Sequence, residues 1–143
     1  MSHSSARRNP TPAESVRLFG LGSIALAGLV GGPLAAGYLV ARNTAVLRLS
    51  YQCNLAIAFF IVASIGWFWI MYRVPHDVLS ELAVHLPQLV VWWVFAALLL
   101  RRQHANHVSA GGSFRSTWVA IGIALFTAIA LRVLLRLVIP GVL

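Results

Sequence analysis

The polar residues that could do chemistry in this chain gather on two of its apolar stretches. Glu81, His85 and Gln88 are spaced by four and three residues, so they share one face if this stretch is a helix. Arg132 and Arg136 lie four residues apart near the end of the last apolar stretch. If the two helices are antiparallel neighbours, Glu81 is level with Arg136 and His85 is level with Arg132. The pattern predicts a polar seam of these five residues between the two helices.

Three roles are open for the polar seam. Ionisable groups inside a membrane are typical of a transport path, and hydrogen bonds between helices also hold bundles together, at about 1 kcal/mol each. Alternatively, the arginines extend their long side chains to the lipid headgroups.

The sequence contains few residues that could support catalysis. The chain contains three acidic residues, and it has neither a nucleophile with a neighbouring base and acid nor a glycine-rich phosphate loop. His104 and His107 are two histidines without a cysteine or carboxylate nearby, which is too few ligands for a typical metal site. We therefore expect a protein that is not an enzyme and that holds neither a metal nor a cofactor.

Small residues recur at every fourth position in the first and last apolar stretches. The positions are Gly28, Gly32 and Ala36, with Gly31 on the adjoining face, and Ala120, Ala124 and Ala128. Such spacing lets helix backbones approach closely in lipid. The contact can lie within the chain or with a partner, and a partner surface would be left unoccupied in the monomer. Pro33 lacks a backbone N–H, so we expect a kink in the first helix.

Four apolar stretches must position these residues. The chain has 143 residues, of which 59% are hydrophobic and 10% charged, and its mean hydropathy is +0.83. A helix needs about 20 apolar residues to cross a hydrocarbon core of about 30 Å. We predict an all-α, four-transmembrane-helix up-down bundle in residues 17–143, with a kinked, Gly-rich first helix and a polar, disordered tail at 1–16. The predicted helices cover about 18–40, 51–72, 82–100 and 118–139.

The net charge of +8 comes from arginines in short loops and at helix ends, which suits anionic headgroups rather than nucleic acid. With four crossings, the side of the termini holds six arginines and the other side five, and all three carboxylates fall on the terminal side. This favours cytoplasmic loops at 41–50 and 101–117, with both termini outside. Insertion in both orientations is the alternative.

Two segments resemble motifs of an uncharacterised family of small polytopic bacterial membrane proteins. They are GGPLAAGYLVARN at 31–43 and GGSFRSTW at 111–118. The resemblance implies a bacterial inner-membrane protein with a basic, cytoplasmic first loop, and it implies no activity.

The sequence favours a protein that binds a membrane partner, or itself, through helix–helix contacts of its first or last helix. Accessory and immunity-type membrane proteins of this size act in this way. One alternative is a small homo-oligomeric transporter or channel, in which the polar seam faces a water-filled cavity. The other is a holin-like pore former. In each case the lipid bilayer is a partner and nucleic acid is not.

Overall fold

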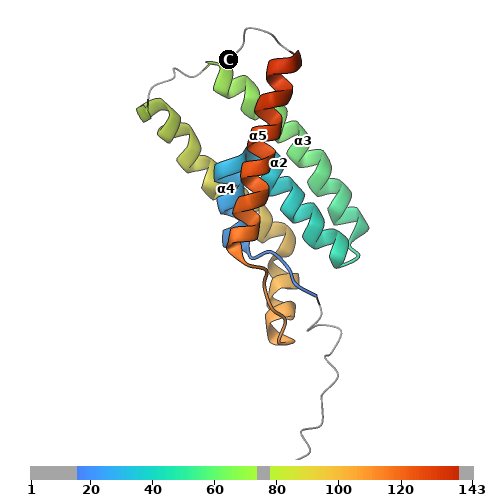
Figure 1. Ribbon diagram of the computed structural model, residues 1–143. Coiled ribbons are helices and arrows are strands. Elements are labelled where there is room, and N and C mark those ends of the chain that lie inside the picture. Colours follow the sequence, from blue (N-terminus) through green and yellow to red (C-terminus); the bar gives the residue numbers. More distant parts are fainter. Residues whose placement is uncertain (1–15, 74–77, 139–143) are drawn as a thin grey trace, which may run out of the picture.

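The computed structural model describes residues 16–73 and 78–138 and is all-α (Figure 1). Its helices are α2 (Leu21–Val46), α3 (Ser50–Arg73), α4 (Val78–Ser109) and α5 (Thr117–Val138). All four are long and apolar enough to cross a membrane, which confirms the predicted class and makes the chain a multi-pass membrane protein. The predicted tail, apart from Val16, lies outside the described residues.

α4 continues well beyond the predicted boundary at residue 100. Residues 101–109, expected to form a loop, remain helical up to a glycine stop at Gly111 and Gly112. Gly111 has φ of 75°, and its N–H donates to Val108 O at 3.0 Å, while Gly112 N–H donates to His107 O at 2.8 Å. These are the two hydrogen bonds of a Schellman motif, which needs glycine for the left-handed residue.

α2 reverses direction in its middle. Gly32 has φ of 72° and ψ of −172°, which breaks the helix in a region that only glycine adopts readily. Pro33 then begins the second half, where its missing N–H costs little. The Asn43 side chain accepts from Phe19 N–H and donates to Phe19 O, both at 2.8 Å. In a straight helix these residues would be about 36 Å apart. The predicted kink is therefore a complete fold-back, and we call α2 the hairpin.

Both ends of the hairpin lie at one end of the molecule, which we call the loop end (residues 16–20, 47–49 and 110–116) (Figure 1). Arg115 N–H donates to Leu18 O at 2.7 Å, and Leu18 and Phe114 form an isolated backbone bridge. The two halves, 21–31 and 33–46, are about 16 and 21 Å long, shorter than the hydrocarbon core. Residues 16–20 therefore lie at the same end of the molecule as the connections at 47–49 and 110–116. The four-crossing prediction had placed these connections on the opposite side of the membrane.

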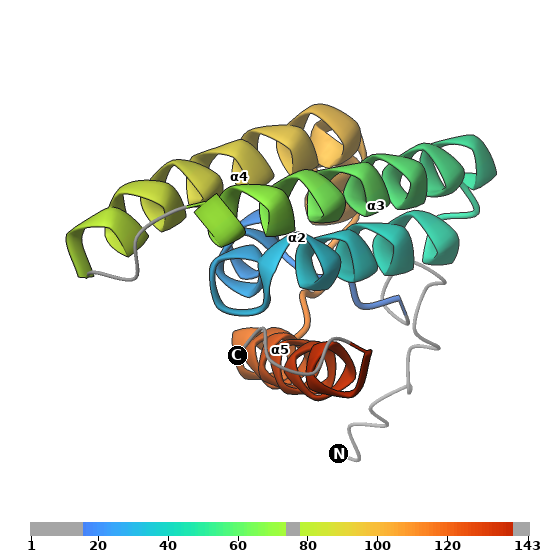
Figure 2. The same ribbon diagram turned by 90° about the horizontal axis from the view of Figure 1, so that it is seen from above.

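The hairpin is the centre of the fold. Figure 2 shows α3 and α4 on one side of α2 and α5 on the other, and α2 packs against all three. In the most apolar window of α2, 61% of the residues are buried, against 11% in α5. The bundle thus consists of three helices around a hairpin, and the outer faces of α3, α4 and α5 are apolar and exposed.

Cysteine labelling tests the fold-back directly. On a Cys53→Ser background, Val16→Cys, Ser50→Cys and Ser113→Cys are expected to react with an impermeant maleimide from one side of the membrane. Tyr72→Cys is expected to react from the opposite side, since α3 starts at the loop end and crosses the molecule. Four crossings would instead pair position 16 with position 72. None of these substitutions changes an arginine, so the charge that orients the protein is kept.

Candidate functional site

The predicted small-residue face of the first helix forms the inside of the hairpin. Gly28 and Ala36 lie on opposite halves, and a Cβ added at Gly28 would be 3.2 Å from the Ala36 Cβ. The same Cβ would be 2.5 Å from the Trp92 ring of α4. Gly32, predicted to continue this face, is the turning point. The three residues do not form one surface of one helix, because the chain reverses between them.

The other glycine contacts seat α5 and α3 on the hairpin. A Cβ at Gly31 would be 2.6 Å from the Ala124 backbone oxygen, and one at Gly37 would be 2.5 Å from Phe60 Cβ. Ala120 and Ala124 of α5 are both fully buried. The close approach predicted from small residues therefore occurs within the chain, and the faces of Gly28, Gly31 and Gly37 are occupied in the monomer.

Arg132 and Arg136 continue the four-residue spacing of the α5 alanines, but they do not lie inside the bundle. Ala128 is half-buried, and Arg132 and Arg136 are exposed. Each step of four residues advances about 400° around a helix, so the series turns about 40° per step away from α2. After Ala124, two steps are enough to bring Arg132 out of the contact.

The polar seam does not assemble as predicted. His85 Nδ1 lies 3.2 Å from Gln88 Oε1, and the His85 ring is 5.3 Å from the Trp67 ring of α3. Since α2 lies between α4 and α5 (Figure 2), neither His85 nor Gln88 is brought to the two arginines of α5. The side chain of Glu81 lies outside the described residues, and so does its predicted pairing with Arg136.

Gln88 instead contacts the backbone of the hairpin. It is buried, and its Nε2 donates to Gly28 O at 3.1 Å. Gly28 lies one turn before the break at Gly32, where helical carbonyl groups run out of amide partners. An unpaired carbonyl is costly in a membrane, so a glutamine from a neighbouring helix stabilises a broken helix at that depth.

The two loop-end histidines brace the backbone. His104 Nε2 donates to Phe19 O at 2.9 Å, and His107 Nε2 donates to Ser113 O at 3.0 Å. The Phe114 ring packs against both imidazoles, with centroid distances of 5.5 and 5.6 Å. In the described part of the chain, no three histidine, cysteine, aspartate or glutamate residues are placed to hold a metal ion. This pattern supports a structural role for both histidines.

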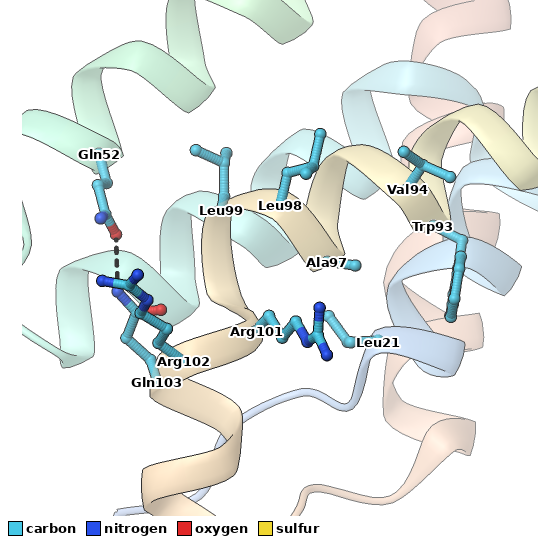
Figure 3. A pocket seen from close by; sticks show the side chains of 10 residues that line it. All are labelled: Leu21, Gln52, Trp93, Val94, Ala97, Leu98, Leu99, Arg101, Arg102 and Gln103. Carbon is cyan, nitrogen blue, oxygen red and sulfur yellow. Dashed lines mark hydrogen bonds between the residues drawn. The ribbon is translucent and has the colours of Figure 1, made fainter.

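A cavity of about 770 Å³ runs along α4 toward the loop end, with Leu21 of α2 and Gln52 of α3 at its sides (Figure 3). Its walls combine apolar side chains with arginines and amides. They are Leu21, Gln52, Trp93, Val94, Ala97, Leu98, Leu99, Arg101, Arg102 and Gln103. Sequence reasoning missed this cavity because 101–103 were assigned to a loop. The sequence did contain a signal for the longer helix, because neither glycine nor proline occurs between residue 101 and Gly111.

The fold therefore defines the class as a small, multi-pass α-helical membrane protein built around a hairpin, which is formed by the break in α2. Comparison with family models, curated proteins and solved structures finds no match to this chain. The function must accordingly be inferred from the chain's own geometry.

Proposed function

We infer that this protein acts without catalysis, by binding a second membrane protein along the outer face of α5. The observation that carries this proposal is Arg132, which is exposed on the helix that buries least of its surface. It stands among Ile129, Val133 and Leu134, which are themselves more than half exposed. A guanidinium on an apolar helix face needs a counter-charge or a polar environment.

The apolar surroundings of Arg132 favour a protein partner. It lies 15 residues beyond Thr117, or about 22 Å along a helix that crosses about 30 Å of hydrocarbon. A carboxylate on a neighbouring helix would pair with it there. The glycine and alanine faces of the hairpin are already covered by other helices of the same chain. We therefore place the partner surface on the outside of α5 and not on the predicted small-residue faces. The transporter alternative is less well supported, because α2 lies between His85 or Gln88 and the α5 arginines.

We further infer that the loop end is cytoplasmic and that the membrane is the bacterial inner membrane. Of nine described arginines, six lie at or next to the loop end: Arg17, Arg42, Arg48, Arg101, Arg102 and Arg115. Arg73, Arg132 and Arg136 lie toward the opposite end. Among these nine arginines, four crossings would place five on the side of the two loops and four on the other side. The fold-back moves Arg17 to the loop end and gives six against three, and the positive-inside rule favours the richer end as cytoplasmic.

Site-specific photo-crosslinking in native membranes tests the partner surface. A crosslinker placed at Phe126, Ile129 or Val133 is expected to capture one protein whose membrane span carries a carboxylate. Val62 and Ile65, on the exposed side of α3, are matched control positions, being 70% and 67% exposed. Arg132→Leu is expected to reduce capture about tenfold or more, since it leaves the partner's carboxylate unpaired in lipid.

Two results would contradict the proposal. One is equal capture from α3 and α5, which indicates collisions without a docking face. The other is capture that persists in Arg132→Leu, or a captured span without a carboxylate. Arg73→Leu is the charge control, because Arg73 is also an exposed arginine away from the loop end and lies at the end of α3.

A further inference from the structure

The cavity at the loop end is polar at one end. Arg101 and Arg102 are consecutive and exposed, and they line it together with Gln52 and Gln103. The two side-chain amides are hydrogen-bonded at 3.3 Å, which joins the start of α3 to α4. Figure 3 shows Arg101 extending toward Leu21 and Arg102 extending on the side of Gln52. The polar end of the cavity thus holds one guanidinium on the α2 side of α4, and a second guanidinium with two amides on the α3 side.

The other part of the cavity is apolar and runs away from the loop end. Trp93, Ala97 and Arg101 are spaced by four residues and share one face of α4. Trp93 is about 12 Å from Arg101 along the helix axis. The small Ala97 side chain between them leaves space that a larger residue would fill. Val94 and Leu98 line the same cavity.

This arrangement matches the chemistry of an amphipathic anion. Guanidinium groups bind phosphate oxygens by paired, charge-assisted hydrogen bonds. Glutamine amides donate to ester or glycerol oxygens. The apolar wall suits a hydrocarbon chain entering from the membrane. Basic pockets between membrane helices are known to bind the headgroups of anionic lipids.

We propose that this cavity is a specific site for an anionic phospholipid of the leaflet at the loop end. The phosphate contacts Arg101, and an acyl chain follows the wall of Trp93, Ala97 and Leu98, while Arg102 adds positive charge from the side of α3. The ligand shares its phosphate with soluble phosphate esters, and the apolar wall is what assigns the site to a lipid. The proposal is independent of the partner surface on α5, which lies on the other side of the hairpin (Figure 2).

Lipid binding to the purified full-length protein, measured by native mass spectrometry, tests the site. The probes are phosphatidylglycerol, phosphatidylcholine of the same acyl chains, and glycerol 3-phosphate as a soluble competitor. We expect one phosphatidylglycerol to be retained in preference to phosphatidylcholine. Arg101→Gln with Arg102→Gln is expected to weaken retention roughly 25-fold, about fivefold for each arginine. Arg17→Gln with Arg42→Gln removes the same charge from exposed positions outside the cavity and is expected to have little effect.

The apolar wall is tested separately by Ala97→Phe, which keeps both arginines and fills the space between Trp93 and Arg101. We expect it to lower phosphatidylglycerol retention at least fivefold. Equal losses in the two double variants would show general charge attraction and overturn the proposal. Full retention in Ala97→Phe, with displacement of the lipid by glycerol 3-phosphate, would assign the site to a soluble phosphate. Equal retention of both lipids would also overturn it.

Discussion

Gly31→Ala is expected to lower the free energy of unfolding by about 3 kcal/mol, the upper part of the range for overpacking. The added Cβ would be 2.6 Å from the Ala124 backbone oxygen and 2.8 Å from its Cα. Both atoms belong to the backbone of α5, so no side-chain rotation can relieve the contact. The whole of α5 must move away from the hairpin, and the fully buried contacts of Ala120 and Ala124 are lost with it.

Thermal unfolding of the purified variants in one detergent measures this effect. Gly22→Ala and Gly122→Ala are the matched controls, because each lies in a helix and a Cβ there meets nothing within 4 Å. Alanine is the better helix former by about 1 kcal/mol, so both controls are expected to keep or raise stability. If Gly31→Ala behaves like these controls, α5 does not pack on Gly31 in the way described. Gly37→Ala then serves as a second test, through Phe60 of α3.

The four helices could be predicted because the signal for a membrane helix is local. About 20 consecutive apolar residues are enough, whatever the rest of the chain does. The hairpin could not be predicted in this way, since the α2 sequence has the length and hydropathy of a span. Gly32 and Pro33 indicated a kink, but the reversal depends on the φ and ψ angles of Gly32. It also depends on Asn43 reaching a residue 24 positions earlier.

The described part of the polar seam, His85 and Gln88 against the α5 arginines, differs from the prediction for a related reason. Helical spacing correctly placed His85 and Gln88 together, and their side chains are in contact. It could not say which helix lies next to α4. The prediction took α5 as the neighbour because short connections favour adjacent antiparallel helices. The folded hairpin is instead wide enough to separate α4 from α5 (Figure 2). Gln88 then meets a backbone carbonyl of the break, where the sequence had suggested arginine and glutamate.

Asn43→Leu is expected to destabilise the protein by about 2–4 kcal/mol and to open the hairpin at the loop end. Asn43 is 1% exposed, and its amide serves both backbone groups of Phe19. Leucine has a similar volume but no polar atoms. It leaves Phe19 N–H unpaired, while Phe19 O keeps the hydrogen bond from His104. Asn54→Leu, at an exposed position of α3, is the matched control and is expected to be nearly neutral. We call the two hydrogen bonds between Asn43 and Phe19 the clamp. Equal stability of the two variants would show that the clamp does not hold the hairpin closed.

The shared carbonyl gives the clamp a second signature. Because Asn43 and His104 donate to the same Phe19 oxygen, removing either leaves that oxygen with one donor. Removing both, with Asn43→Leu and His104→Phe, leaves it buried with none. An orphaned buried carbonyl costs about 1–3 kcal/mol beyond the loss of each single bond. The double variant is therefore expected to lose more stability than the two single variants together, by at least about 1 kcal/mol in unfolding measurements. Strict additivity would mean that the two residues hold the hairpin independently, and that the clamp does not centre on Phe19.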